Sequence, residues 1–183
     1  MNANTRPQSE ANPPQEGDLA FGLTESFAGK TVIIGIGNRY LRDDGIGIQV
    51  ADEFTRRHLR EDILVRSYQT VDLSLLATFE GASKIIVVDA LKSGEPPGKV
   101  SRYTILPSKD ALVAIPAPHA VKLQDMFDIA IQTGLLTCPV TVIGIEPKDC
   151  TAGEGVSAEL LHALPDVLDT VGQEVDGSRQ DPR

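Results

Sequence analysis

Short apolar runs rich in β-branched residues alternate with amphipathic stretches along this chain, and this alternation constrains the fold more than any other feature. Parallel strands joined by crossover helices produce such a pattern, because strands covered on both faces carry few polar residues. Predicted strands of this kind lie at residues 30–36, 63–69, 84–90 and 139–147. The run at 98–106 alternates apolar with polar residues, so we expect a half-exposed, antiparallel edge strand there.

Helical periodicity fills the stretches between these runs. In residues 45–59, Ile46, Val50 and Phe54 are spaced four apart and predict a helix with one apolar face. Pro165 should kink the last predicted helix or split it in two. The other helices are predicted at 71–81, 120–133 and 157–171. The sequence therefore predicts an α/β fold with three layers, α/β/α, around a mostly parallel sheet of about five strands.

The two ends of the chain differ in composition from its middle. With 183 residues the chain has the length of a single domain. Residues 1–28 are rich in Asn, Pro, Gln, Glu and Gly without periodicity, so we expect a flexible leader. Residues 173–183 have the same character and predict a flexible tail, which leaves 29–172 as the folded domain.

Charge and hydropathy narrow the range of partners. The net charge of −9 repels nucleic acid and anionic membrane surfaces. The first residues lack a secretory signal, and no apolar stretch is long enough to span a membrane, so we expect a cytoplasmic protein and further expect a monomer.

The only cysteines, Cys138 and Cys150, are too few for a disulfide framework, and we expect them to be buried or in loops.

The segment GIGNRYLRDDGIG, residues 35–47, begins like the glycine turn of a nucleotide-binding fold. A dinucleotide fingerprint requires a third small residue at position 40, where this chain has Tyr40. Asp43 and Asp44 would also repel a pyrophosphate held in this loop. The segment therefore argues against a nucleotide cofactor and favours a cation.

Carboxylates follow several predicted strands, at the edge where open α/β sheets bind ligands. Asp44 follows the first strand, Asp89 ends the third, Glu146 ends the last, and His119 opens a helix. Asp44, Asp89 and His119 together offer two carboxylates and an imidazole, which suit a divalent transition metal. Asp89 could alternatively accept hydrogen bonds from loop N–H groups. Asp43 is expected mainly to cap its own helix.

Four segments in this order, GIGNRYLRDDGIG, IIVVDA, PHAVKLQDM and VIGIEP, resemble the motifs of the hydrogenase maturation endopeptidases, with a similarity that covers residues 31–172. The resemblance implies an endopeptidase that removes a C-terminal peptide from the large-subunit precursor of a nickel-iron hydrogenase after nickel insertion. It also implies that Asp44, Asp89 and His119 bind nickel, and that this nickel belongs to the precursor and serves as a recognition handle.

Other residues of the predicted site have less defined roles. Asp43 lies next to a proposed ligand and is a candidate general base or a residue that orients a ligand. Asn38, Gln69 and Thr70 are candidates for substrate binding. The chain departs from the family where YQTVDL replaces the Gly-Gly-Thr turn of many members, and at Asp44, where some members carry the longer glutamate.

Two alternative functions stay open at this point. The chain could be a non-catalytic nickel-binding checkpoint or a metallochaperone-like module that inspects the precursor without cutting it. It could also be a related metal-assisted peptidase that acts on another protein. Cleavage of the nickel-loaded precursor separates the processing endopeptidase from these two alternatives.

Overall fold

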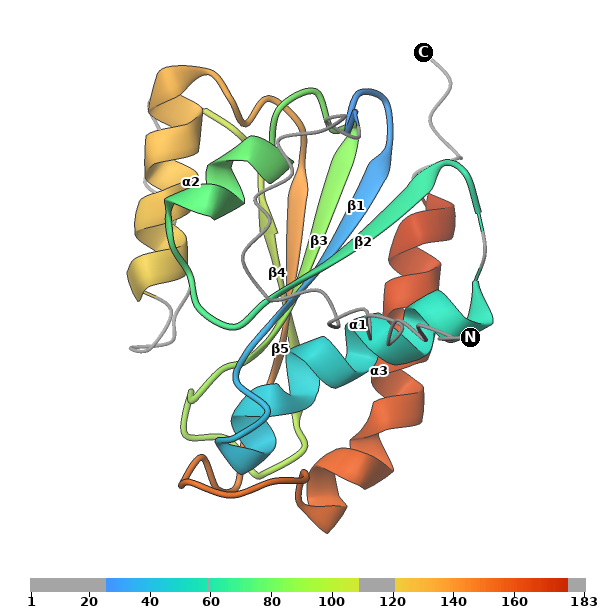
Figure 1. Cartoon of the computed structure of the whole chain (residues 1–183), viewed down its shortest axis with the longest axis vertical. Helices are drawn as coiled ribbons and strands as arrows, with labels where there is room; N and C mark the ends of the chain where they lie inside the picture. Colours follow the sequence, from blue (N-terminus) through green and yellow to red (C-terminus); the bar gives the residue numbers. More distant parts are fainter. Residues whose placement is uncertain (1–25, 59, 109–120, 178–183) are drawn as a thin grey trace, which may run out of the picture.

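The computed structural model describes residues 26–58, 60–108 and 121–177 of the chain. It contains a five-stranded sheet in the order β2-β1-β3-β5-β4 (Figure 1). All neighbouring strands are parallel except β4 and β5. The predicted mostly parallel sheet with an antiparallel edge strand is confirmed. The strands are β1 (Thr31–Ile36), β2 (Ile63–Tyr68), β3 (Lys84–Ala90), β4 (Val100–Ile105) and β5 (Val140–Ile145).

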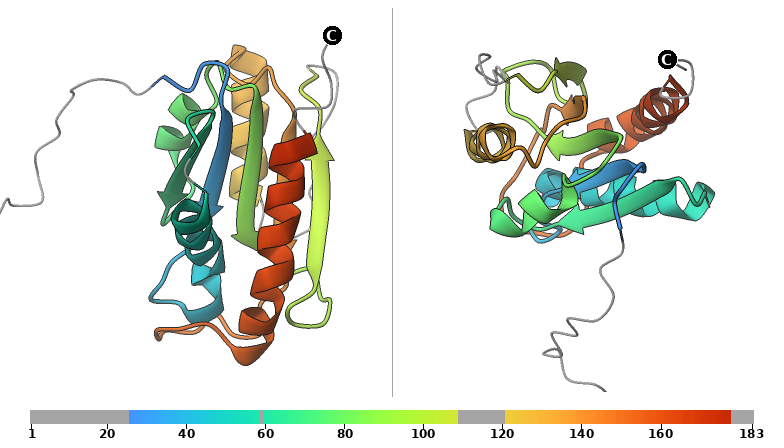
Figure 2. Two further views of the ribbon diagram at one scale, coloured as in Figure 1. Left: turned by 90° about the vertical axis from the view of Figure 1, so that its right-hand side faces the viewer. Right: turned by 90° about the horizontal axis from the view of Figure 1, so that it is seen from above.

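Helices cover both faces of the sheet and give the predicted three layers (Figure 2). Val32 and Ile34 of β1 belong to the core on the α2 side, whereas Ile33 belongs to the core under α1 and α3. None of the described helices is long and apolar enough to cross a membrane. One face carries α1 (Ile46–Arg57) and α3 (Ala158–Gly177), and the other carries the 3-10 helix η2 (Leu73–Thr78) and α2 (Val121–Thr133).

Pro165 lies inside α3, which continues unbroken from Ala158 to Gly177, so the predicted split into two helices is wrong. A proline removes the helical hydrogen bond to the carbonyl four residues earlier, here that of Leu161. Pro165 is exposed and Leu161 is 50% exposed, so water can solvate this carbonyl. Leu160 and Val167 are fully buried and hold the helix on the sheet on either side of the proline.

The C-terminal part of α3 extends beyond residue 172, where the sequence predicts the end of the domain. Glu174 is buried, and its carboxylate accepts hydrogen bonds from Lys84 Nζ at 2.7 Å and Thr141 Oγ1 at 3.0 Å. It also pairs with Arg102. These contacts fasten α3 to β3, β4 and β5, so the start of the predicted flexible tail is folded, and residues 178–183 lie outside the described residues.

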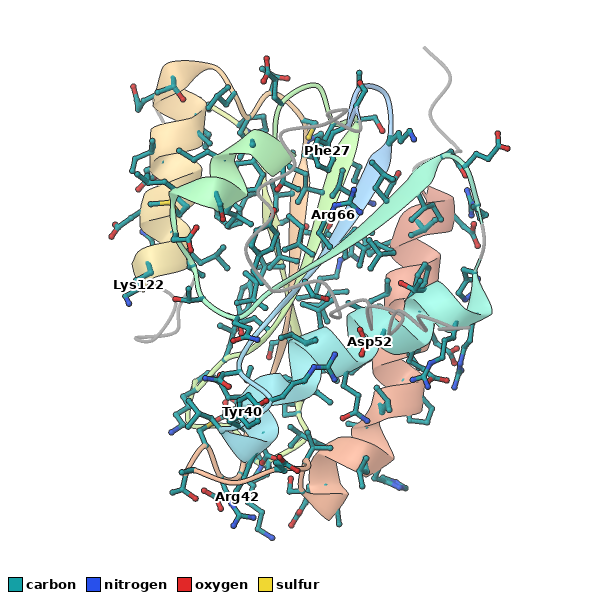
Figure 3. The ribbon with its side chains drawn as sticks, in the orientation of Figure 1. Phe27, Tyr40, Arg42, Asp52, Arg66 and Lys122 are labelled. Atoms are coloured by element: carbon teal, nitrogen blue, oxygen red, sulfur yellow. The ribbon has the colours of Figure 1, made fainter. Side chains whose placement is uncertain are left out.

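The folded domain also begins slightly earlier than predicted. Phe27 lies within the predicted leader but packs against the core on the α2 side of the sheet. The guanidinium carbon of Arg66 lies 5.6 Å from the centroid of the Phe27 ring (Figure 3). Residues 26–28 therefore belong to the domain, while the rest of the predicted leader lies outside the described residues.

We expect Glu174→Ala to lower the free energy of unfolding by about 3 kcal/mol, because Lys84 would keep a largely buried charge without its partner. The matched variant Asp176→Ala removes an exposed carboxylate from the same end of α3, and we expect a change within about 0.5 kcal/mol. Urea unfolding followed by circular dichroism measures both values. Equal losses in the two variants would contradict an anchoring role for Glu174.

The Glu174 contacts also predict a pH dependence. Burial by itself would raise the pKa of Glu174, but the hydrogen bond and charge of Lys84, with Thr141 and Arg102, lower this pKa below the ordinary value of 4.5. A carboxyl group with a lowered folded-state pKa stabilises the fold above its unfolded-state pKa, and this contribution is lost as pH falls through the folded-state value. Below about pH 5, wild type should therefore lose stability more steeply than Glu174→Gln. Parallel pH profiles would count against this contribution.

Candidate functional site

The loops that follow β1, β3 and β5 lie at the carboxyl edge of the parallel strands, at the lower end of Figure 1, whereas the loop that follows β2 turns back toward η2. Asp44 lies in the short 3-10 helix η1 (Arg42–Gly45), at the end of the loop after β1. Asp89 lies next to the last residue of β3. Because β1 and β3 are neighbours in the sheet, the topology brings the two carboxylates to one place, as the sequence predicts.

The loop after β1 holds the carboxylate of Asp44. Gly37 has a φ of 141°, and a Cβ at Gly37 would lie 1.7 Å from the carbonyl oxygen of Asp44. Glycine is therefore required where the two ends of the loop meet. The N–H of Asn38 donates to Asp44 Oδ2 at 2.7 Å, while Asn38 Oδ1 accepts from the N–H of Tyr40 at 2.9 Å. These bonds fix one oxygen atom of the partly buried Asp44 carboxylate.

The charge of Asp44 acts on the carboxyl group of Asp89. Burial raises the pKa of Asp89, the negative charge of Asp44 raises it further, and despite a hydrogen bond from the N–H of Ala90 it reaches about 8. A cation between two such carboxylates would relieve their repulsion. Asp89 thus has both an N–H donor and a neighbouring carboxylate, and a cation site at this pair stays a prediction.

The third predicted ligand, His119, lies outside the described residues, and its role stays a prediction. Among the residues that the structure describes, no three His, Cys, Asp or Glu side chains are grouped to hold a metal ion. Asp44 and Asp89 offer two oxygen ligands, so a protein site of three ligands needs one further donor. Helix α2, which follows His119 in the sequence, starts at Val121 and runs away from the carboxyl edge in Figure 1.

The predicted substrate-binding residues lie along the same edge of the sheet. Asn38 is partly buried and uses its backbone and side chain in the turn described above. Gln69 and Thr70 follow β2 and are exposed. The N–H of Gly37 donates to the carbonyl of Tyr68 at 3.0 Å, which places the start of the β2 loop beside the β1 loop. Their contribution to substrate binding stays a prediction.

Most of the chain matches one known protein family. The family model described as hydrogenase maturation protease matches residues 48–174. The chain belongs to the hydrogenase maturation protease family. The matched residues include the positions of Asp89 and His119, and they begin shortly after Asp44.

Individual relatives give the same result. The hydrogenase expression/formation protein HupD of Bradyrhizobium diazoefficiens is 28% identical over 129 residues, which cover 69% of this chain and 67% of HupD. The hydrogenase maturating endopeptidase HybD of Escherichia coli has the same fold, with a TM-score of 0.72 and 20% identity over 81% of this chain and 93% of HybD. A hydrogenase 2 maturation peptidase from a Thaumarchaeota archaeon gives a TM-score of 0.62 and 26% identity, covering 81% and 99% of the two chains. Members of this family are endopeptidases, a class of hydrolase.

In this hydrogenase maturation protease, Asp43 has a structural role that its position in the sequence does not reveal. Its side chain caps neither η1 nor α1, so the predicted cap of its own helix is wrong. Asp43 is fully buried and accepts hydrogen bonds from the N–H groups of Lys148, Asp149 and Ser157 at 2.8, 2.9 and 2.6 Å. The Ser157 hydroxyl donates a further bond at 3.0 Å. Asp43 therefore ties the loop after β5 to the loop that carries Asp44.

These bonds also bear on the predicted catalytic role of Asp43. Burial would raise its pKa, but the hydrogen bonds from Ser157, Asp149 and Lys148 lower the pKa below the ordinary value of 3.8. A carboxylate with several donors and a lowered pKa accepts a proton poorly. The geometry therefore favours Asp43 as a residue that orients its neighbours over Asp43 as a general base.

We expect Asp43→Ala to lower the free energy of unfolding by about 3 kcal/mol or more, because several N–H groups would lose their acceptor. Asp43→Asn keeps one acceptor oxygen but turns an amide N–H₂ toward the donors, so we expect a loss of about 2 kcal/mol. Amide hydrogen exchange at Lys148 and Ser157 should accelerate in both variants. The control is Asp166→Asn on the exposed side of α3, and unchanged exchange in the Asp43 variants would contradict the assignment.

A close contact between α1 and the sheet explains the missing glycine at position 40. A Cβ at Gly47 would lie 2.2 Å from the carbonyl oxygen of Ile36 and 2.3 Å from that of Val88. A Cβ at Gly35 would lie 2.2 Å from the carbonyl oxygen of Gly47. Gly47 therefore provides the close packing of helix on strand that a nucleotide-binding turn obtains from its third glycine. Because the loop after β1 is longer than a nucleotide-binding turn, the glycine that packs against the sheet lies further along the chain than position 40. In the sequence, only the spacing between Gly47 and the apolar positions of the following helix could have indicated this role.

Glu146 and the two cysteines complete the set of candidate residues from the sequence. Glu146 accepts hydrogen bonds from the N–H and hydroxyl of Ser93, both at 2.7 Å, and so holds the loop after β3. Cys138 is buried and Cys150 is partly buried in a loop, as predicted. Burial raises the pKa of both thiols, that of Cys138 to about 11. Both thiols are therefore mostly protonated near neutral pH, which disfavours a cysteine nucleophile.

Proposed function

We propose that this protein removes a C-terminal peptide from the nickel-loaded precursor of a nickel-iron hydrogenase large subunit. One observation carries the proposal: Asp89, whose pKa burial and then the negative charge of Asp44 raise to about 8, shares with Asp44 the ligand-binding edge of a chain of the hydrogenase maturation protease family. In this proposal nickel is part of the substrate, and Asp44, Asp89 and His119 recognise it.

The donor set suits this task. Carboxylate oxygens and an imidazole nitrogen bind divalent transition metals, and a bound divalent ion can polarise a nearby carbonyl group. The chain supplies Asp44 in a fixed orientation through the N–H of Asn38. Asp43 fixes the loop behind Asp44, and Gln69 and Thr70 are proposed to contact the substrate beside β2.

The proposal is tested by incubating the purified protein with the cognate large-subunit precursor in nickel-loaded and nickel-free forms. Mass spectrometry should show C-terminal shortening of the loaded form alone. An intact loaded precursor would exclude the proposal. Binding of the loaded precursor without cleavage would instead favour a nickel-binding checkpoint or a metallochaperone-like module.

We also propose that the protein acts as a cytoplasmic monomer without a nucleotide cofactor or nucleic-acid partner. The net charge of −9 repels polyanions such as nucleic acid, and the acidic pair in the first loop repels the phosphates of a nucleotide. Both observations support the absence of these two ligands. Light scattering should give the mass of one chain. ATP and NAD should leave the melting temperature unchanged, because a ligand that binds the folded state would raise it.

A further inference from the structure

A cavity of about 360 Å³ opens beside η1, between the β1 loop and the loop before α3. We refer to it as the arginine pocket. Figure 3 shows Tyr40 and Arg42 at this lower end of the molecule. Its lining includes Arg39, Tyr40, Arg42, Gln49, Glu154 and Val156. The mechanism proposed above uses none of them.

The walls of the arginine pocket are held in place by backbone contacts. Arg42 has a φ of 48°, a left-handed conformation that costs energy for a residue with a side chain. The N–H of Arg42 donates to the carbonyl of Gly153 at 3.0 Å, and the N–H of Gly153 donates to the carbonyl of Tyr40 at 2.9 Å. The Asp43 hydrogen bonds hold the same two loops together. The fold thus maintains an unfavourable conformation that presents the Arg42 side chain at the pocket.

The chemistry of the pocket suits a carboxylate on an extended peptide. The guanidinium groups of Arg39 and Arg42 are positioned by ion pairs with Asp52 and Asp149, neither of which lines the pocket. A guanidinium has five N–H donors, so one ion pair leaves further donors for a second carboxylate. Tyr40 is 64% exposed and provides an apolar surface beside these donors.

The location of the pocket indicates its occupant. Gly45 lines the pocket and directly follows Asp44, so a polypeptide whose nickel is held at Asp44 must pass close by. The carboxyl edge also carries Asp43, Asp44 and Asp89, and the whole chain has a net charge of −9. An acidic peptide is therefore repelled from most of this surface. The residues that line the arginine pocket include two cations, Arg39 and Arg42, and one anion, Glu154, so the pocket lining is less negative than the surrounding edge.

We propose that the arginine pocket binds an acidic side chain of the precursor close to its nickel site, and thereby fixes the register of the segment to be cut. This inference rests on the proposed function, because it takes the precursor as the ligand. It assigns a specificity role to Arg39 and Arg42 that neither the metal ligands nor the family membership provides.

The test uses Arg39→Gln and Arg42→Asn in the full chain. Asparagine tolerates the left-handed backbone at position 42, so this variant removes the guanidinium without disturbing the loop. Each variant should raise the KM for nickel-loaded precursor about tenfold and leave kcat unchanged, since it weakens substrate and transition state equally. Arg57→Gln removes an exposed arginine at the other end of α1 and should have wild-type kinetics.

A binding measurement separates this inference from the proposed function. A fluorescent peptide that spans the precursor's cleavage region should bind about tenfold more weakly to each arginine variant in anisotropy titrations. Replacing its acidic residues by amides should weaken wild-type binding equally, whereas amidation of its C-terminus should not. The inference would be overturned if both arginine variants had the KM and the peptide affinity of the wild type. A precursor whose cleavage region lacks acidic residues would also overturn it. Failure of wild type to cut the loaded precursor, with the peptide still bound through the arginines, would overturn only the proposed function.

Discussion

Asp89→Asn is expected to slow processing of the nickel-loaded precursor by about 100-fold or more while thermal stability stays equal or rises. Asparagine has nearly the same shape as aspartate and can still accept the hydrogen bond from Ala90, but it is a neutral and weaker ligand. The substitution also removes the repulsion between Asp89 and Asp44, so the fold should not suffer. Precursor cleavage followed by mass spectrometry and the melting temperature by scanning fluorimetry give the two readouts.

Asp44→Asn and His119→Ala should reduce processing to a similar extent. Asp44→Asn can keep the bond from the N–H of Asn38, so it tests charge with little change in the loop. The matched control is Asp169→Asn, which removes an exposed carboxylate from α3. If Asp44→Asn, Asp89→Asn and His119→Ala all process the precursor at the wild-type rate, the assignment of the metal ligands is wrong.

Gly47→Ala is expected to lower the free energy of unfolding by about 3 kcal/mol or more. The added Cβ would overlap the carbonyl oxygens of Ile36 and Val88, which belong to the backbone of β1 and its neighbour β3. Backbone atoms in a sheet cannot move aside as a flexible side chain can, so α1 itself would have to shift. Asp44 lies in η1, directly before this helix, and we therefore expect processing to fall together with stability.

Gly172→Ala provides the matched control for this substitution. Gly172 lies in α3, and among the described residues an added Cβ there meets open space. Alanine should stabilise that helix by up to about 1 kcal/mol relative to glycine. Urea unfolding compares the two variants directly, and a Gly47→Ala protein as stable as wild type would refute the close contact between α1 and the sheet.

Local patterns of apolar and polar residues predicted the elements of this fold, because the pattern of a segment depends on which of its faces are buried. The run at residues 139–147 is mostly apolar, and β5 is buried along its whole length. Alternation at 98–106 predicted the antiparallel edge strand β4. Of the two outcomes predicted at Pro165, a kink or a split, the split does not occur, because buried residues on both sides of the proline hold α3 on the sheet.

The candidate site was partly predictable for a topological reason. Parallel strands end at one edge, so Asp44 and Asp89 could be placed together without knowledge of any distance. The role of Asp43 could not be predicted, since its donors Lys148, Asp149 and Ser157 lie more than 100 residues away in the sequence.

The sequence by itself determined the α/β class, the order of the elements and the strands that end in carboxylates, because these follow from periodicity and from short-range chain geometry. Only the tertiary structure decided that Asp43 joins two distant loops, that Gly47 allows α1 to touch the sheet, and that Arg42 faces a cavity. These features depend on contacts between segments far apart in the chain. Such contacts arise from packing in three dimensions, which no local pattern of residues encodes.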